Sequence, residues 1–148
     1  MEVAVGAQGQ DVIGEYLAAQ VGTITGSQDD VRTDAPDAVH QMRVAARRVR
    51  TTLRVFGRLL RRDLTDPVRE VLRWLAGELG PVRDAEVVRE RVLTTLGDLP
   101  EEQFHGPVEQ RRRTEFDDEY EAARGRLLIA MGSPRHTALQ TLLGEQIP

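Results

Sequence analysis

The sequence predicts an all-α protein folded as an antiparallel four-helix bundle, and three observations support this fold class. Four segments carry apolar residues every three to four positions, which is the period of an amphipathic helix. No segment alternates apolar and polar residues with the two-residue period of a half-buried strand. The connections between the four segments are mostly short, as in bundles whose neighbouring helices run antiparallel. A chain of 148 residues is long enough for one such domain.

The first helix is expected at residues 10–24, where Val12, Leu17 and Ile24 belong to the apolar series. Residues 1–9 are expected to form a flexible N-terminal segment, which leaves residues 10–148 as the helical domain. The polar stretch TGSQDD that follows the first helix is expected to be a loop.

The second helix is expected to start at Asp34 as N-cap, with Pro36 just inside, and to continue to about Arg62. An N-cap side chain accepts hydrogen bonds from backbone N–H groups that have no partner within the helix, and proline tolerates the first turn. The pattern therefore predicts one long helix that contains most of the basic residues in this part of the chain.

The third helix is expected to open at Asp66 and Pro67, after a short turn, and to reach about Leu96. Pro81 interrupts its pattern. Proline lacks a backbone donor, and its ring would clash with the carbonyl of Gly77 in a straight helix. A kink is therefore expected at this point.

The fourth helix is expected to begin near Pro107, after the polar connection GDLPEEQFHGP, and to extend at least to Met131. Ser133 as cap and Pro134 at the first turn then restart it. This restart predicts a short break rather than the end of the bundle.

Composition excludes several classes of protein. The chain has no cysteine and no lysine, so a disulfide framework, a thiolate nucleophile, a P-loop and Schiff-base chemistry are excluded. It has no glycine-rich phosphate loop or nucleophile elbow, and its three histidines are scattered. We therefore expect no enzyme activity, no bound metal and no cofactor. Without a membrane-spanning apolar run or a secretory signal pattern, the expected location is the cytoplasm.

Positive charge is concentrated in residues 40–62, which hold eight arginines and no acid in a chain of net charge −4. On a helix that turns about 100° per residue, the apolar residues of this segment occupy one arc of about 80°. A second arc of about 80° lies directly beside it and forms a basic stripe roughly 30 Å long. The stripe contains His40, Arg43, Arg47, Arg50, Arg54, Arg58 and Arg61, whereas Arg48 and Arg62 lie elsewhere on the helix.

Like charges four residues apart on a helix cost a few tenths of a kcal/mol per pair, so a bound multivalent anion would stabilise this stripe. A thin chain of phosphates suits an arginine stripe in an acidic protein better than duplex nucleic acid, which the acidic surroundings would repel. Single strands usually need stacking aromatics, and the chain has few. Two alternatives stay open. One is a nucleic-acid-binding module, and the other is a purely structural bundle in which acids of the fold pair with the arginines.

Two segments in combination, AVHQMRVAARRVRTTLRVF and LRWLAGELGPVRDAEVV, resemble the CHAD domain, the conserved histidine α-helical domain. The resemblance covers the chain from about residue 10 to its end. It implies an all-helical fold, non-catalytic binding of inorganic polyphosphate and frequent fusion to CYTH-type triphosphate enzymes. It also implies targeting to polyphosphate granules or assistance to a polyphosphate-processing enzyme. In the first motif, the family's basic positions fall on His40, Arg43, Arg47, Arg48, Arg50 and Arg54. The second motif adds Arg83 and Asp84.

The bend expected at Pro81 suggests a role for this second motif. It would aim Arg83 at the basic stripe, while Asp84 pairs with an arginine of the second helix and fixes its rotamer. The alternative is that Arg83 and Asp84 form only a surface pair.

Complete CHAD domains contain two four-helix units related by pseudo-symmetry, and this sequence matches one unit. Either the sequence is a piece of a longer one, or it is a half-domain that pairs with a second copy as a homodimer. The acidic and lysine signature of the CYTH enzymes is absent, so the enzyme that the resemblance implies as a partner is not within these residues.

Overall fold

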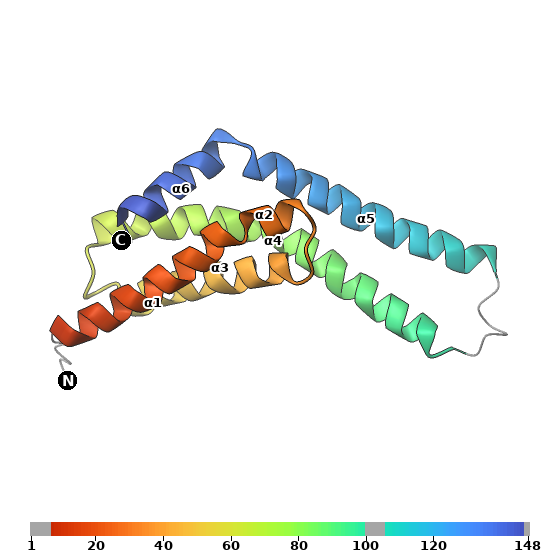
Figure 1. The fold of residues 1–148 in the computed structure, drawn as a ribbon, viewed down its shortest axis with the longest axis horizontal. Coiled ribbons are helices and arrows are strands. Elements are labelled where there is room, and N and C mark those ends of the chain that lie inside the picture. Colours follow the sequence, from red (N-terminus) through yellow and green to blue (C-terminus); the bar gives the residue numbers. More distant parts are fainter. Residues whose placement is uncertain (1–6, 100–105, 147–148) are drawn as a thin grey trace.

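A computed structural model gives the fold, and it describes residues 7–99 and 106–146. Within these residues the chain forms helices and no strand, so the predicted all-α class is confirmed. Figure 1 shows their arrangement. The helices are α1 (Ala7–Gly26), α2 (Gln28–Arg32), α3 (Ala38–Val55), α4 (Arg62–Gly97), α5 (Pro107–Met131) and α6 (Pro134–Gln146).

The long helix α4 organises the bundle. Helices α1 and α3 pack on each other, and α3 runs antiparallel to the first half of α4 (Figure 1). The shorter α6 packs on α4 near its beginning, whereas α5 packs along its second half (Figure 1). Helices α5 and α6 therefore lie one after the other along α4 and together form the fourth helical segment. The antiparallel arrangement of four helical segments is confirmed, with the fourth segment in two pieces.

The core joins the apolar faces of all the long helices. Met42, Val49 and Leu53 of α3 are buried, as their helical spacing predicts. Leu72 and Leu79 of α4 are also completely buried, together with residues of α1, α5 and α6. Burial of this kind contributes about 1.5–3 kcal/mol for each large apolar side chain, so these faces hold the helices together.

The expected loop after the first helix is partly helical, which corrects the sequence prediction. Helix α1 continues to Gly26, and the short α2 follows after Ser27. Gln28 and Val31 of α2 are buried, and Gln28 accepts a hydrogen bond from the side-chain amide of Gln140 on α6 (2.6 Å). These tertiary contacts stabilise a helical turn in a polar stretch whose local propensity favours a loop.

The start of α3 also differs from the prediction, because Asp34 is not its N-cap. Asp37 occupies that position with a left-handed backbone (φ 66°), and its carboxylate accepts a hydrogen bond from the amide of Gln41 (2.7 Å). Asp34 is also left-handed (φ 58°). Aspartate tolerates this region better than most residues, and here two aspartates turn the chain sharply between α2 and α3.

Helix α3 ends at Val55, and α4 begins at Arg62, so the predicted boundaries at about Arg62 and at Asp66 were wrong. Gly57 supplies the physical reason for the turn. A Cβ atom at this residue would lie 2.8 Å from the backbone oxygen of Leu53. Only glycine therefore lets the turn pack this closely against the end of α3.

Both prolines of α4 lie inside the helix. Pro67 is in its second turn rather than at its opening, and Pro81 lies near its middle. Each removes one backbone hydrogen bond. Figure 1 shows α4 changing direction near its middle, so the interruption expected at Pro81 is a bend within one helix of 36 residues.

The break between α5 and α6 is confirmed as predicted. Pro134 is the first residue of α6, and the hydroxyl of Ser133 accepts a hydrogen bond from the backbone N–H of His136 (3.3 Å). Residues 100–105 of the expected polar connection lie outside the described residues. So do residues 1–6 of the expected N-terminal segment, whose last three residues begin α1.

Candidate anion-binding site

The basic residues of the second predicted helix divide between α3 and the turn after it. His40 and the arginines at 43, 47, 48, 50 and 54 lie on α3, which gives the stripe on this helix a length of about 21 Å at 1.5 Å per residue. Arg58 and Arg61 lie in the turn, which corrects their expected place on the helix. Arg50 and His40 are half-buried, and the other arginines of α3 are exposed.

The arginines of α3 lack carboxylate partners. Within the described residues, neither they nor Arg58 form an ion pair or a side-chain hydrogen bond. Other arginines do form such pairs, for example Arg61 with Asp63 (2.6 Å) and Arg89 with Asp117 (3.0 Å). The charge of α3 is therefore not neutralised by the fold itself.

A furrow runs between the end of α3 and the beginning of α4. One of its two hollows, of about 410 Å³, is lined by Arg50, Asp66, Arg69, Glu70 and Arg73. The other, of about 320 Å³, lies at the turn and shares Asp66 and Arg69. We call the two hollows together the arginine furrow. Six basic residues line it, namely Arg50, Arg54, Arg58, Arg62, Arg69 and Arg73.

Three residues of the arginine furrow come from α4 and were missed in the sequence. Arg62, Arg69 and Arg73 share one face of the helix with Asp66, because their spacing of seven and four residues matches whole turns. The short turn between α3 and α4 places this face beside the end of α3. That spacing, read together with a short antiparallel turn, is the signal that could have found them.

Not all the predicted residues meet in this furrow. Arg47 and Arg48 line a separate hollow of about 380 Å³ on the side of α1, together with Tyr16 and Thr51. The basic residues of α3 therefore diverge, with Arg50 and Arg54 facing α4 and Arg48 lying towards α1.

The structure gives Arg83 and Asp84 a different arrangement from the expected one. Arg83 pairs with Glu86 one turn further along α4 (3.2 Å), and it lines a hollow with Asp37, at the opposite end of α3 from the arginine furrow. Asp84 pairs with no arginine of α3.

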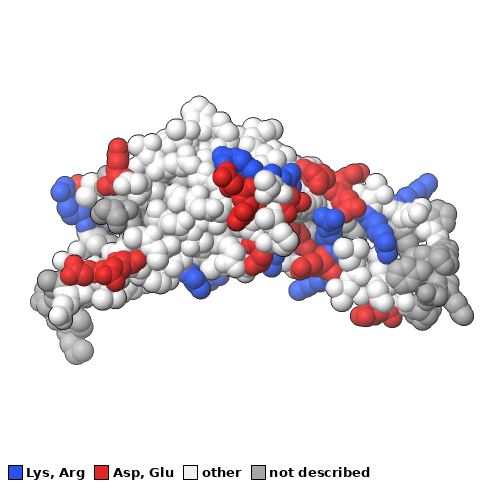
Figure 2. All heavy atoms as spheres, viewed as in Figure 1, with Lys and Arg blue, Asp and Glu red and all other residues white. Residues whose placement is uncertain are grey.

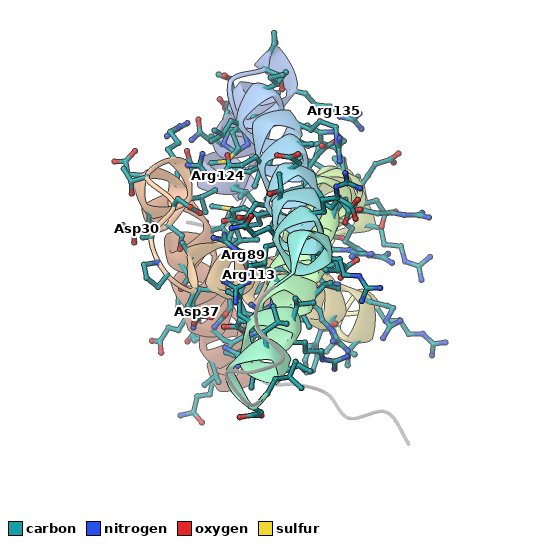
Figure 3. The ribbon with its side chains drawn as sticks, turned by 90° about the vertical axis from the view of Figure 1, so that its right-hand side faces the viewer. Asp30, Asp37, Arg89, Arg113, Arg124 and Arg135 are labelled. Carbon is teal, nitrogen blue, oxygen red and sulfur yellow. The ribbon has the colours of Figure 1, made fainter. Side chains whose placement is uncertain are left out.

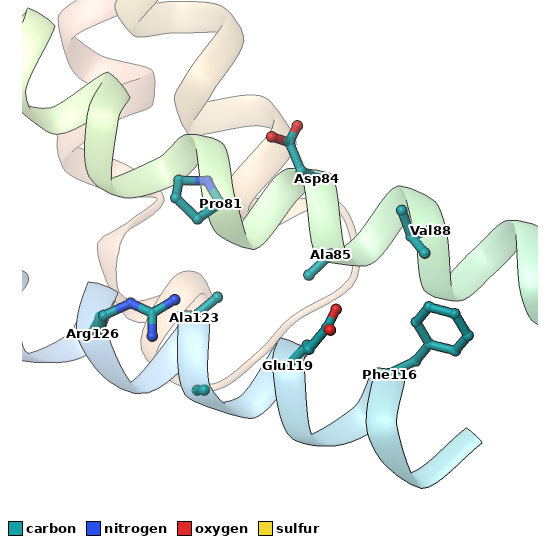
Figure 4. Close-up of a pocket in the computed structure, with 9 residues that line it drawn as sticks. Pro81, Asp84, Ala85, Val88, Phe116, Glu119, Ala123 and Arg126 are labelled. Atoms are coloured by element: carbon teal, nitrogen blue, oxygen red, sulfur yellow. The ribbon is translucent and has the colours of Figure 1, made fainter. Parts of the chain in front are cut away.

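Asp84 instead borders a hollow of about 390 Å³ between α4 and α5 (Figure 4). There Phe116 and Glu119 reach from α5 towards Ala85 and Val88 on α4, and Asp84 points away from α5. The expectation that Asp84 orients an arginine of α3 is therefore corrected.

The faces of the molecule differ in charge. On the face of Figure 2, arginines lie in small groups beside acids, without a continuous basic area. In Figure 3, side chains that end in nitrogen extend from the right-hand side of the molecule, beside α3 and the first half of α4. This is the side that carries the arginine furrow.

Neither a membrane span nor a metal cluster is found in the described part of the chain. No helix in it is both long and apolar enough to cross a lipid bilayer. No three histidine or carboxylate side chains in residues 7–99 and 106–146 gather as metal ligands would.

The fold and the furrow define an all-α helical domain with an arginine-rich groove between two antiparallel helices. The chain belongs to the CHAD domain family, whose model matches residues 15–147. It is 38% identical over 124 residues to "Uncharacterized protein MT2285" and to "Uncharacterized protein Rv2226", from two strains of Mycobacterium tuberculosis. In each case the match covers 78% of this chain and 23% of the relative.

Among solved structures, the chain resembles PptA from Streptomyces chartreusis with a TM-score of 0.67 and 26% sequence identity. The similarity covers 93% of this chain and 48% of PptA. The chain therefore spans about a quarter of the length of the mycobacterial relatives and about half of the length of PptA.

Proposed function

We propose that this chain is a non-catalytic module that binds inorganic polyphosphate in the arginine furrow and along the exposed face of α3. One observation carries the proposal, which is that five of the six arginines of the furrow have no carboxylate partner within the described residues. Arg69 is the exception, because it pairs with Asp66 (3.4 Å). A phosphate chain supplies the missing counter-charges.

The chemistry of the furrow fits phosphate. A guanidinium group donates two parallel hydrogen bonds to phosphate oxygens and remains charged at every physiological pH. Polyphosphate is a thin chain with a charge on every phosphate, so it follows a groove between two helices in which six arginines outnumber the carboxylates of Asp66 and Glu70. Beyond the furrow, the ligand continues past Arg47 and Arg43 towards His40.

Duplex DNA is the less suitable ligand. A duplex is too wide to enter hollows of about 320 and 410 Å³, so its phosphates would meet the exposed carboxylates of Asp66 and Glu70, which line the furrow. Single-stranded nucleic acid needs aromatic platforms, and the lining of the furrow contains none. The alternative of a purely structural bundle also loses support, since the arginines of α3 have no ion-pair partner among the described residues.

Binding of polyphosphate by this module has a consequence for where its partner proteins act in the cell. A module that holds polyphosphate without cleaving it brings an attached or associated protein to polyphosphate granules in the cytoplasm, or presents the chain to a CYTH-type enzyme. Two copies facing each other place a second arginine furrow on the same ligand, so the homodimer forms more strongly when polyphosphate is present. Light scattering with and without polyphosphate measures this.

The experiment compares two variants with the same change in net charge. The test variant replaces four arginines of the furrow by glutamine, Arg50, Arg54, Arg62 and Arg73. The matched control replaces four exposed arginines outside the furrow, Arg91, Arg111, Arg112 and Arg126. Calorimetry with polyphosphate should give an affinity at least ~100-fold lower for the test variant, because each charge-assisted contact is worth about 1.5 kcal/mol or more.

The control should lose less than about tenfold, through its net charge alone. Circular dichroism should show equal helicity in both variants. Equal losses in the two variants would contradict the proposal, as would equally strong competition by DNA of matched charge.

A further inference from the structure

The arginine furrow ends at the turn between α3 and α4, in the hollow of about 320 Å³. Four arginines from three different elements line this hollow. Arg54 comes from the last turn of α3, Arg58 from the turn, and Arg62 and Arg69 from α4. Such convergence concentrates positive charge at one point rather than along a line.

Opposite charge is sparse in this hollow. Asp66 is its one lining carboxylate, and it already pairs with Arg69 (3.4 Å). The other three arginines form no ion pair or side-chain hydrogen bond within the described residues. Thr65 adds a hydroxyl group, which is both a donor and an acceptor.

The other hollow of the furrow has a weaker charge. It is lined by Arg50, Arg69 and Arg73, but also by the two carboxylates of Asp66 and Glu70. Positive charge therefore increases along the furrow towards the turn.

The backbone fixes the position of the turn. A side chain at Gly57 would meet the backbone oxygen of Leu53 at 2.8 Å, so the turn lies directly against the end of α3. This approach sets where Arg58 lies relative to Arg54 and Arg62. The backbone positions that carry Arg54, Arg58 and Arg62 are thus held close together by the fold before a ligand arrives.

Polyphosphate has two kinds of phosphate group. An internal phosphate carries a single negative charge, whereas a terminal phosphate carries close to two at neutral pH and has three free oxygens, as a phosphate monoester does. The terminal group matches the hollow at the turn, where several arginines have no ion-pair partner among the described residues. The internal groups match the rest of the furrow, which carries less net positive charge.

We infer that the hollow lined by Arg54, Arg58, Arg62 and Arg69 holds the terminal phosphate of a polyphosphate chain, so that the module binds its ligand by one end. This inference rests on the proposed function, since it assigns a direction to the ligand in the same furrow. Internal phosphates then follow past Arg50 and Arg73.

Capped and uncapped polyphosphate of one short chain length test the inference. The cap is a neutral alkyl ester on both terminal phosphates, which removes one charge and one free oxygen from each end. The parent protein should bind the free-ended chain about tenfold more tightly than the capped chain, the equivalent of one charge-assisted hydrogen bond. The preference should weaken below about pH 6, where a terminal phosphate takes up its second proton.

Two double variants separate the end from the rest of the furrow. Arg58→Gln with Arg62→Gln should remove the preference for free ends, so that both ligands bind with equal affinity. Arg50→Gln with Arg73→Gln should weaken both ligands by a similar factor and keep the tenfold ratio. All four side chains lie at the protein surface or are half-buried, and circular dichroism checks that both variants fold.

The outcomes distinguish this inference from the proposed function. If the parent protein binds capped and free-ended chains equally well, recognition of the end is wrong while polyphosphate binding stands. If it binds neither ligand, the proposed function fails and the inference fails with it. If Arg50→Gln with Arg73→Gln abolishes the preference, the terminal phosphate is not in the hollow at the turn.

Discussion

The hydroxyl of Tyr120 on α5 donates a hydrogen bond to the carboxylate of Asp34, in the connection between α2 and α3. One turn further along α5, the guanidinium of Arg124 lies 3.4 Å from the same carboxylate and donates a hydrogen bond to the backbone oxygen of Arg32 (2.6 Å). Figure 3 shows Arg124 reaching from α5 towards α2. Two side chains of α5 thus fix the turn from which α3 starts.

Replacing Tyr120 by phenylalanine should lower the free energy of unfolding by about 1–2 kcal/mol, because a buried hydrogen bond to a charged group is lost. Burial, followed by the hydrogen bond to Asp34, raises the pKa of the Tyr120 hydroxyl, so it stays protonated and donates at neutral pH. Urea unfolding measures the change. Tyr16→Phe is the control, since Tyr16 is 42% exposed, and it should unfold as the parent does. Equal losses for the two variants would contradict the prediction.

Gly57→Ala should destabilise the turn that carries Arg58. The new Cβ would meet the backbone oxygen of Leu53 at 2.8 Å, and a backbone shift of this kind costs about 1–3 kcal/mol. Polyphosphate affinity should fall as well, because the arginines beside the turn move. Gly14→Ala in α1 is the matched control, because no described atom outside its chain neighbours and the nearby backbone of its own helix lies within 4 Å of its added Cβ. It should stabilise the helix by about 0.5–1 kcal/mol, and a stable Gly57→Ala variant would show that the turn adapts freely.

His136 on α6 should make stability depend on pH. Its side chain is 1% exposed, and neither ring nitrogen has a hydrogen-bond partner among the residues that the structure describes. Burial, followed by the charge of Arg32, lowers the pKa of His136, so the folded protein keeps it neutral where the unfolded chain takes up a proton. The contribution of His136 to the free energy of unfolding is therefore full above about pH 6.5. It decreases as the pH falls towards the pKa of His136 in the folded protein.

Thermal unfolding at pH 7, 6 and 5 tests this dependence. His136→Leu should show a smaller loss of melting temperature on acidification than the parent, and a gain of about 1 kcal/mol at pH 5 from removing an unsatisfied buried group. Thr137→Ala, on the exposed side of the same helix, removes no titratable group and should keep the pH dependence of the parent. If both variants lose stability on acidification as the parent does, another group controls it.

The fold class could be predicted because burial imposes a period on the sequence. Met42, Val49 and Leu53 recur at helical spacing, and all three are buried in the core. Helix boundaries were less predictable, since they depend on atoms distant in sequence. The carboxylate of Asp34 is engaged by Tyr120, 86 residues away, rather than by the N–H groups of α3. No local pattern contains that information.

The candidate site was predictable along one helix and not between two. The spacing of Arg50 and Arg54 placed them on one face of α3. The contribution of Arg69 and Arg73 required knowing that α4 begins early and lies antiparallel beside α3. Arg83 followed the family pattern in sequence, and its ion pair with Glu86 has the three-residue spacing of neighbours on one helix. Its position at the opposite end of α3 from the furrow depends on how α3 and α4 pack.

Every cation of the furrow between α3 and α4 is an arginine, because the chain contains no lysine. Guanidinium groups do not lose their proton at any pH that a living cell reaches. Acetylation, which neutralises lysine, has no target in the furrow, and methylation of arginine would leave the charge in place. Under the proposed function, occupancy of the furrow is therefore controlled from outside the protein, by the charge and concentration of the anion and by the ionic strength of the solution.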